Sequence, residues 1–333
     1  MIFIENEGHS NPKLNLALEE YALRNFSFET DYLLFYINEP SIIIGRSQNT
    51  LEEINHDYVE ENNIHVVRRI SGGGAVYHDF GNLNFSFITN HNVKSLNNFK
   101  KFTAPVIGAL SKIGVEAELK GRNDILVNDK KISGTAQFST GKRMISHGTL
   151  LFNTDLGEVA NALQVKMSKI ISKGHKSVRS RVANISEFIS KPLKIEEFRA
   201  LLLRGLYEEM EPFETYHLTA EEWKAVHSLK EEKYDSWDWN YGRSPKFNIQ
   251  HSKRFPVGEI DVRLFVEKGY LTGLRIFGDF FGQEPIENLE NILIGVKYEK
   301  EEISNKLNEV KIEEYFGNVS TSQFIALLFS IDA

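Results

Sequence analysis

The sequence predicts an α+β protein with one large domain and a small C-terminal domain. Segments that alternate between apolar and polar residues, as strands do, are interspersed with segments whose apolar residues recur at helical spacing. Of the 333 residues, 41% are hydrophobic, which is enough to bury a sizeable core. This succession of strand-like and helix-like segments is interrupted at residues 237–245 and then starts again. We therefore expect a domain over residues 1–244, a linker over residues 245–252 and an accessory domain over residues 253–333.

Composition excludes several kinds of function. The formal net charge is −7 and the basic residues are spread along the chain, so no nucleic-acid partner is expected. No apolar run approaches ~18 residues and no signal peptide is visible, so we expect no membrane partner and a cytoplasmic location. The chain has no cysteine, which removes disulfides, thiolate metal sites and cysteine nucleophiles. Its ten histidines lack H-x-x-x-H or H-x-H spacing, so no dedicated zinc or iron site is expected.

The first elements are a helix and two short strands. Residues 11–26 predict a helix whose apolar face recurs at i, i+4 and i+7, namely Leu14, Leu18 and Tyr21. Glu19 and Glu20 lie on this helix, and the ordinary expectation for both is a solvated charge. Strands are expected at residues 32–36 and 41–44, followed by a helix over residues 51–62 and a buried strand at residues 64–67.

That buried strand leads into Gly72, Gly73 and Gly74, preceded by Arg68 and Arg69. Glycine is costly to order, so a glycine run in an ordered loop suggests that its backbone approaches a ligand closely. Successive N–H groups beside guanidinium groups form a cradle for an anion such as phosphate. The run fits neither the dinucleotide fingerprint nor the P-loop, and a bulge or tight turn without a ligand stays an alternative.

A hairpin is the next informative feature. After a strand at residues 83–88 and an amphipathic helix over residues 99–113, the sequence predicts strands at residues 125–127 and 131–133 around an Asn128-Asp129 turn. Lys131 then returns toward Asn123 and Asp124. An exposed strand lysine is ordinarily a solvent-facing charge, but Asp124 could hold Mg²⁺ together with substrate phosphates, as that ion prefers.

The remaining elements carry fewer functional signals. We expect a strand over residues 143–152 containing His147, helices over residues 154–163 and 196–210, and a helix starting at a Thr219-x-x-Glu222 capping box. A basic run at residues 173–181 is either a solvated face or a contact for phosphate or an acidic partner. The accessory domain predicts strands at residues 258–266 and 270–277 and helices at residues 303–310 and 323–329, without a catalytic constellation.

Several blocks, in order, resemble the lipoate–protein ligase A family. The match is carried by Asn11-x-x-x-Asn15-Leu16-Ala17-x-Glu19-Glu20, Arg68-Arg69-x-Ser71-Gly72-Gly73-Gly74-Ala75-Val76-x-His78-Asp79-x-Gly81-Asn82, Gly121-Arg122-Asn123-Asp124, Lys131-Ile132-Ser133-Gly134, His147-Gly148-Thr149-Leu150-Leu151, Ser177-Val178-Arg179-Ser180-Arg181-Val182 and Trp239-Asn240-x-Gly242. These blocks span residues 11–242, and the C-terminal part resembles the family's accessory domain on weaker patterns.

The resemblance implies a fold and a reaction. The fold would be the mixed sheet flanked by helices that biotin–protein ligases and class II synthetase cores share. The substrates would be lipoate and ATP with Mg²⁺, giving lipoyl-adenylate and pyrophosphate. The lipoyl group would then pass to a lysine on lipoyl domains of 2-oxoacid dehydrogenase E2 subunits or on the glycine-cleavage H protein.

The resemblance also implies site residues. Lys131, Asp124 and Asn123 would be catalytic, with Asp124 organising Mg²⁺. The nucleotide or adenylate would be bound by Arg69, Ser71, Gly72, Gly73, Gly74, Ala75, Val76, Tyr77, His78, Asp79 and Lys131. Lipoate would be bound by Lys131, Arg69, Leu16, Glu20, Tyr36 and His147. For His78 and His147, site lining and structural hydrogen bonding stay open.

Other functions differ from ligation in testable ways. Octanoyl- and lipoyltransferases of the same fold depend on a cysteine, which this chain lacks. A lipoyltransferase that uses preformed lipoyl-AMP would need only the transfer step, and a biotin–protein ligase would carry a glycine–arginine loop that is absent. A non-catalytic lipoate sensor would predict the loss of Lys131 or Asp124. We also expect any hinge between the domains to lie at residues 242–248.

Overall fold

The computed structural model describes residues 1–92, 95–163, 182–207, 213–242 and 248–329, which fall into two compact units. The first unit comprises Met1–Ile43, Glu53–Arg68 and Val76–Ser236, and the second comprises Ile44–Glu52, Arg69–Ala75 and Trp237–Ala333. The predicted basic run at residues 173–181, most of the expected hinge and the end of the helix expected over residues 196–210 lie outside the described residues.

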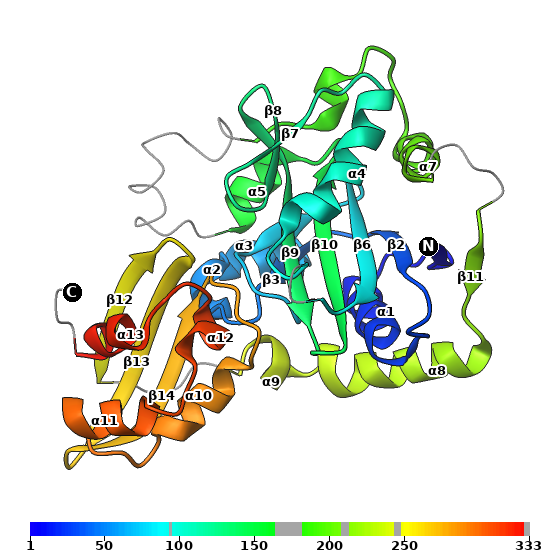
Figure 1. The fold of residues 1–333 in the computed structure, drawn as a ribbon. Helices are drawn as coiled ribbons and strands as arrows, with labels where there is room; N and C mark the ends of the chain where they lie inside the picture. Colours follow the sequence, from blue (N-terminus) through cyan, green and yellow to red (C-terminus); the bar gives the residue numbers. More distant parts are fainter. Residues whose placement is uncertain (93–94, 164–181, 208–212, 243–247, 330–333) are drawn as a thin grey trace. The chain divides into compact units, whose positions relative to one another are not determined.

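An eight-stranded mixed sheet forms the centre of the first unit (Figure 1). Its order is β11-β1-β2-β6-β10-β9-β8-β7, and β1 pairs in parallel with both of its neighbours while the other pairs are antiparallel. The strands are β1 (Ile2–Glu5), β2 (Tyr32–Ile37), β6 (Asn82–Asn90), β7 (Glu118–Lys120), β8 (Asp124–Val127), β9 (Lys130–Ser139), β10 (Arg143–Leu151) and β11 (Thr215–His217). The predicted mixed sheet is confirmed.

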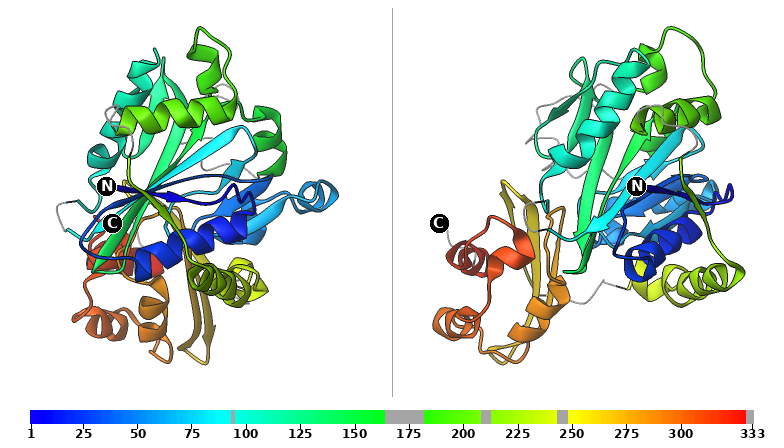
Figure 2. Two further views of the ribbon diagram at one scale, coloured as in Figure 1. Left: turned by 90° about the vertical axis from the view of Figure 1, so that its right-hand side faces the viewer. Right: turned by 45° about the vertical axis from the view of Figure 1, so that its right-hand side comes forward.

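Helices cover both faces of this sheet (Figures 1 and 2). On one face, α4 (Phe99–Lys112) and α7 (Ile195–Leu206) pack into a core with side chains such as Phe35 and Phe85. On the other face lies α1 (Pro12–Asn25), and α8 (Ala220–Leu229) packs along α1. Because successive side chains of a strand point to opposite faces of the sheet, one strand can pack against the helices on both faces.

The predicted helix over residues 11–26 is confirmed as α1. It starts where the Asn11 side chain accepts hydrogen bonds from the backbone N–H groups of Lys13 and Leu14. The expectation that Glu19 and Glu20 are solvated is wrong, since they are 1% and 2% exposed. The reason is that α1 is covered by the sheet on one side and by α8 on the other.

The single helix predicted over residues 51–62 is wrong as well. It is divided into α2 (Thr50–Glu53) and α3 (His56–Glu61). Between them, Ile54 forms a β-bridge with Leu163, and the backbone N–H of Asn55 donates to the carbonyl of Ala162. These contacts, with residues far along the chain, replace the helical hydrogen bonds that local propensity favours.

A second, three-stranded sheet holds the strands around the glycine run. It consists of β4 (His65–Arg68), β3 (Ser41–Ile44) and β5 (Val76–His78), in that order. The strand predicted at residues 41–44 has the expected bounds, and the strand predicted at residues 64–67 is shifted by one residue. The first unit also contains α5 (Leu156–Ala162), the short helix η2 (Ile185–Phe188) and the π-helical turn η3 (Lys230–Tyr234).

The predicted hairpin is confirmed as β8 and β9. Its two turn residues, Asn128 and Asp129, have φ values of 49° and 62°. A two-residue turn with both residues in the left-handed region matches the twist of the strands that it joins, and Asn and Asp tolerate that region well. Local sequence was therefore sufficient to place this hairpin.

The C-terminal part of the second unit is a small α+β fold, as predicted. Three antiparallel strands carry helices on one face, around a core that includes Ile260, Leu274 and Phe324. The elements are α9 (Trp237–Asn240), β12 (Ile249–Phe255), β13 (Gly258–Glu267), β14 (Tyr270–Gly278), α10 (Ile286–Leu293), α11 (Lys300–Leu307), α12 (Ile312–Phe316) and α13 (Thr321–Leu328).

The expected linker differs from the structure at one point. β12 starts at Ile249, which pairs with Leu264, so an ordered strand begins inside the segment 245–252. The division into domains at residues 244 and 253 stays a prediction. Within the described ranges, no helix has the length and apolar content needed to cross a bilayer.

Candidate functional site

Lys131 and Asp124 form an ion pair on the β8–β9 hairpin. Lys131 Nζ lies 2.7 Å from Asp124 Oδ1, and the two side chains are 36% and 29% exposed. The expectation that Lys131 returns toward Asp124 is confirmed. A half-exposed pair of this kind is weakly stabilising in water, so its charges are available to a ligand at little cost in stability.

Two features of the hairpin give the Lys131 side chain its position. The register between β8 and β9 shifts between Ile125 and Leu126, where a bulge redirects the strand. A Cβ built on Gly134 would lie 2.9 Å from Lys131 Nζ, so the absence of a side chain at Gly134 leaves room for the ammonium group. The Lys131 carbonyl also accepts a hydrogen bond from the Ala183 backbone.

Asn123, at the start of the hairpin, is fixed by Thr135 on β9. The Asn123 amide donates to the Thr135 carbonyl, and the Thr135 hydroxyl donates to the Asn123 carbonyl at 2.9 Å. Asn123 therefore anchors the segment that carries Asp124. Over the part of the chain that the structure describes, no three His, Asp or Glu side chains gather as a metal site. One carboxylate on an open hairpin suits Mg²⁺ that takes its remaining ligands from phosphates and water.

The glycine run belongs to the second unit, where Arg69 shapes it. Arg69 Nη2 donates to the carbonyls of Gly72 at 2.6 Å and Gly74 at 2.8 Å, and Nε donates to Ser71 Oγ at 3.0 Å. Arg69 itself is only 6% exposed. Its guanidinium therefore fixes the shape of the loop by binding two of the loop's backbone carbonyls.

The three glycines have different surroundings. Gly73 has a φ of +91°, which L side chains rarely adopt, and a Cβ on it would lie 2.9 Å from a ring carbon of Phe281. A Cβ on Gly72 would lie 2.4 Å from the Phe280 carbonyl oxygen, whereas a Cβ on Gly74 would meet nothing within 4 Å. Packing at Gly72, and backbone conformation together with packing at Gly73, thus require glycine, while a side chain at position 74 would meet no described atom. Ala75 completes this segment of the second unit.

After the run, β5 carries Val76, Tyr77 and His78 in the first unit, followed by Asp79. Burial raises the pKa of the Asp79 carboxyl, although it accepts hydrogen bonds from the backbones of Gly81 and Asp155 at 2.9 and 2.8 Å. Burial, and then the charge of Asp79, raise the pKa of Tyr77 well above its ordinary value. Asp79 thus has a structural role at this turn, and its predicted contact with nucleotide stays a prediction.

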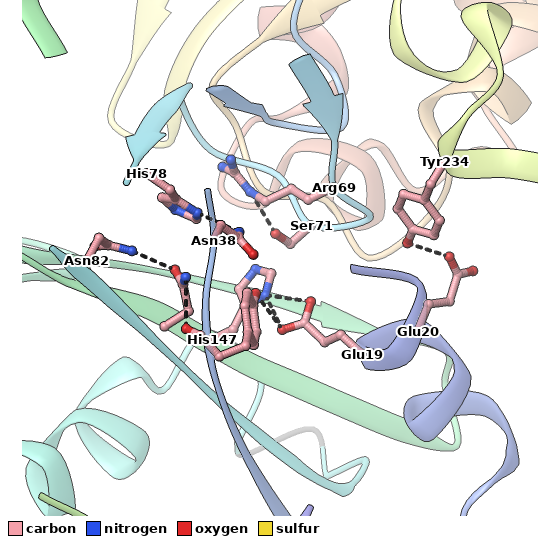
Figure 3. Close-up of polar contacts among 11 residues, drawn as sticks. Glu19, Glu20, Asn38, Arg69, Ser71, His78, Asn82, His147 and Tyr234 are labelled. Carbon is pink, nitrogen blue, oxygen red and sulfur yellow. Dashed lines mark hydrogen bonds and ion pairs between the residues drawn. The ribbon is translucent and has the colours of Figure 1, made fainter. Parts of the chain in front are cut away.

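His147 and Glu19 form a buried contact that the sequence did not predict. His147 Nδ1 lies 2.9 Å from both carboxylate oxygens of Glu19 (Figure 3). The Tyr36 hydroxyl donates to Glu19 Oε1 at 3.4 Å. The contact joins β10, α1 and β2, and so brings together two residues predicted to bind lipoate, Tyr36 and His147. The missed signal was the placement of Glu19 one turn after Asn15 in the N-terminal block.

Glu20 faces a different group of partners. Its carboxylate accepts hydrogen bonds from Lys233 Nζ at 2.7 Å, from the Tyr234 hydroxyl at 2.7 Å and from Arg24 Nε at 2.8 Å. Burial of the Tyr234 phenol, and then the Glu20 charge, raise the pKa of Tyr234, which keeps it a donor. This geometry supports a structural role for Glu20. Its predicted contact with lipoate, like that of the buried Leu16, stays a prediction.

An open cleft of about 400 Å³ lies near the end of β2 in the first unit. Tyr36 and Phe80 are among its lining residues, together with the Glu5–Arg199 ion pair. Neither Lys131 nor His147 lines it. The cleft therefore shares one residue with the predicted lipoate site and is not that site as a whole.

Two family descriptions match the sequence. "Lipoyl protein ligase A/B catalytic domain" matches residues 11–207, and "Bacterial lipoate protein ligase C-terminus" matches residues 244–328. Among curated relatives, lipoate-protein ligase LplJ of Bacillus subtilis is 55% identical over 331 residues, which cover 99% of this chain and 100% of the relative.

Solved structures give a consistent comparison. The P. falciparum protein LipL1, solved with lipoate, has a TM-score of 0.78 at 28% identity, covering 99% of this chain and 98% of its own. The bi-partite lipoate protein ligase of Thermoplasma acidophilum, described with its E2 lipoyl domain, has a TM-score of 0.65 at 32% identity, covering 74% and 98%. A lipoate-protein ligase A bound with ATP has a TM-score of 0.60 at 32% identity, covering 70% and 94%.

Proposed function

Because the chain belongs to the lipoate–protein ligase A family, we propose that it activates lipoate with ATP and transfers the lipoyl group to a lysine of lipoyl domains. It is a ligase by family. The observation that carries the finer proposal is the half-exposed Lys131–Asp124 pair on the hairpin, because a chain that kept only the fold would have no need for this arrangement.

The first half-reaction has to bring two anions together. A carboxylate oxygen of lipoate attacks the α-phosphorus of ATP, a new P–O bond forms, and the bond to the β-phosphate oxygen breaks to release pyrophosphate. Little covalent work is required of the protein, so catalysis depends on position and on charge stabilisation. We assign Lys131 to this role, with its ammonium group between the lipoate carboxylate and the α-phosphate.

The glycine loop is proposed to bind the nucleotide through its backbone. Residues 71–79, which include Ser71, Ala75, Val76 and Tyr77, would surround the adenylate, with Gly74 as the point of closest approach because a Cβ built on it would meet no described atom within 4 Å. Arg69 supports this role by binding the carbonyls of Gly72 and Gly74, which fixes the shape of the loop. A direct contact of the same guanidinium with phosphate or the acyl-phosphate is proposed in addition.

Mg²⁺ would be held by Asp124 together with the phosphates of ATP, beside Asn123. When bound, it would neutralise phosphate charge during release of pyrophosphate. The protein groups contribute the rest: Lys131 binds the reacting oxygens, and Asn123 fixes the segment of Asp124 through Thr135.

In the second half-reaction, a lysine amine of the acceptor protein attacks the carbonyl carbon of lipoyl-adenylate. AMP leaves with the electrons of the anhydride bond, and the attacking nitrogen loses a proton. Lys131 is proposed to stabilise the carbonyl oxygen as its charge develops. The proposed acceptors are lipoyl domains of 2-oxoacid dehydrogenase E2 subunits and the glycine-cleavage H protein.

The lipoyl chain itself would lie among apolar and buried side chains of α1, β2 and β10. Leu16, Tyr36 and His147 come from these three elements, and the Glu19 contacts with Tyr36 and His147 hold two of them together. Glu20 is proposed to support this site indirectly. Its hydrogen bonds with Lys233 and Tyr234 hold α1 against η3.

A lipoyltransferase that uses preformed lipoyl-AMP is the nearest alternative. Incubation of the purified protein with lipoate, ATP, Mg²⁺ and an unmodified lipoyl domain separates the two. We expect the mass of the lipoyl domain to rise by one lipoyl group only when ATP is present, with release of one pyrophosphate per group transferred. Modification by lipoyl-AMP, without any modification by lipoate and ATP, would instead identify a transferase, and no modification by either would identify a sensor.

A further inference from the structure

A chain of buried amides runs through the first unit to His78. Asn6 Nδ2 donates to Asn15 Oδ1 at 3.2 Å, and Asn15 Nδ2 donates to Asn38 Oδ1 at 2.9 Å. The last link joins Asn38 Nδ2 to His78 Nδ1 at 3.0 Å (Figure 3). None of these four residues is more than 4% exposed. Buried amides are retained where each has its partners, so a line of three leading to one histidine indicates a purpose for that histidine.

Backbone groups at the far end of the chain fix the direction of every hydrogen bond in it. Asn6 Oδ1 accepts from the Gly8 backbone N–H at 3.3 Å, and Asn6 Nδ2 donates to the His9 carbonyl at 2.9 Å. Asn15 Nδ2 donates to the same carbonyl at 2.9 Å. A backbone carbonyl can only accept and a backbone N–H can only donate, so neither amide can be turned around.

The direction then propagates to the imidazole. With Asn15 Nδ2 donating to its oxygen, Asn38 has only its NH₂ group to offer to His78. The His78 Nδ1 atom must therefore accept, which means that it carries no proton. A neutral ring with a bare Nδ1 has its proton on Nε2. An imidazolium would instead place two donors against each other.

From this chain we infer that Asn38, backed by Asn15, is a positioning residue that holds His78 as a neutral Nε2–H donor in the adenylate site. The inference rests on the proposed function for the role of His78, and on the hydrogen bonds alone for its protonation. A fixed N–H donor suits the oxygens of an acyl-adenylate, which are acceptors, and a neutral ring leaves Lys131 as the mobile cation of the reaction.

His147 provides an internal contrast. Its Nδ1 faces the Glu19 carboxylate, which can only accept when it is ionised, so His147 carries a proton on Nδ1. The two histidines thus differ at Nδ1. The amide of Asn38 requires an Nδ1 without a proton in His78, and the carboxylate of Glu19 requires an Nδ1 with a proton in His147.

Nitrogen NMR of the protein labelled with ¹⁵N-histidine tests the inference without reference to activity. Two-bond correlations between ring nitrogens and ring protons distinguish the two neutral forms and the imidazolium, and a His78→Gln variant assigns the His78 signals. At neutral pH we expect the Nε2–H pattern for His78. An Nδ1–H or imidazolium pattern in the active native protein would overturn the inference.

The Asn38→Asp variant tests the cause. The new carboxylate can accept from both Asn15 and His78, so the chain stays satisfied while the proton of His78 moves to Nδ1. We expect the NMR pattern to switch, and lipoate-dependent pyrophosphate release to fall by about tenfold, the scale of one hydrogen bond to a charged ligand. Gln137→Glu is the matched control, because Gln137 is also buried and its new carboxylate could accept from the Asn97 backbone and the Ser146 hydroxyl, and it should leave the His78 pattern unchanged.

The outcomes separate the two proposals. A native protein that releases no pyrophosphate would end the proposed function and leave the NMR result for His78 intact. A switch of the His78 pattern in Gln137→Glu, or no switch in Asn38→Asp, would contradict the role of Asn38 even in a fully active ligase.

Discussion

Two lysine–carboxylate pairs in the first unit have the same separation and opposite surroundings. Lys131 and Asp124, and Lys233 and Glu20, are each 2.7 Å apart. In the first pair both side chains are about one-third exposed, whereas in the second Lys233 is 24% exposed and Glu20 only 3%, and Glu20 accepts further hydrogen bonds from Tyr234 and Arg24. Both carboxylate oxygens of Glu20 accept hydrogen bonds, so this pair serves to join α1 to η3. A half-exposed pair on a hairpin can admit a third charge.

The largest effect should come from Lys131. We expect Lys131→Ala to lower lipoylation of an acceptor domain by at least about 100-fold, the scale of one well-placed electrostatic stabiliser. The measurement is the initial rate of modification, followed by mass spectrometry. Lys120→Ala is the matched control, because Lys120 belongs to the strand adjacent to the hairpin and pairs with Asp129 at the exposed turn. Equal losses in both variants would show that the effect is not specific to Lys131.

Substitution in the Lys233–Glu20 pair should change the stability of the protein. Glu20→Gln removes a buried charge that Lys233, Tyr234 and Arg24 all bind, and we expect the free energy of unfolding to fall by about 3 kcal/mol. Asp124→Asn should change it by less than about 1 kcal/mol, since its pair is half-exposed. Denaturant titration measures both. A destabilisation by Asp124→Asn as large as that by Glu20→Gln would remove the distinction between the pairs.

At acidic pH, Glu20 should lose its contribution to the free energy of unfolding. Burial acts to raise the pKa of this carboxyl, but Lys233, Tyr234 and Arg24 outweigh it, so the pKa lies below its ordinary value of 4.5. A depressed pKa contributes stability that is complete above the unfolded value and is lost as the pH falls through the folded value.

The difference in unfolding free energy between the native protein and Glu20→Gln should therefore be constant above about pH 5.5 and shrink below it, because one carboxyl titrates over roughly one unit on either side of its pKa. Denaturant titrations at several pH values measure it. A difference that grows on acidification would mean that the pKa is raised.

The smallest effect concerns Gly134. A Cβ there would lie 2.9 Å from Lys131 Nζ, and the flexible ammonium end can move aside. We expect Gly134→Ala to reduce pyrophosphate release about tenfold through this displacement, with little change in stability. Gly141→Ala, at a turn with a φ of +82° and open space around it, is the control for backbone effects alone. A larger loss of activity in the control would contradict the displacement.

Features were predictable from the sequence when the residues that interact lie close together along the chain. The β8–β9 hairpin and the Thr219–Glu222 capping box depend on residues a few positions apart, and both were found where local chemistry placed them. The burial of Glu19 and Glu20 was missed because their partners, His147 and Lys233, lie 128 and 213 positions away.

The same limit explains the amide chain. Its links join residues 9, 23 and 40 positions apart, and nothing near Asn38 in the sequence indicates a histidine partner. The glycine run was predicted from its local pattern to be a ligand loop, and that role stays a prediction. Its internal division, with packing at Gly72 and open space at Gly74, depends on contacts that only the fold reveals.

The most direct test of Lys131 uses the absence of cysteine from this chain. In a Lys131→Cys variant, that residue is the single thiol. Alkylation with 2-bromoethylamine restores a side chain of nearly the length and charge of lysine, whereas iodoacetamide adds a neutral amide. We predict that the variant has lost lipoate-dependent pyrophosphate release, that bromoethylamine restores it and that iodoacetamide does not. Restoration by both reagents, or an unmodified variant as active as the native protein, would contradict a catalytic ammonium group at position 131.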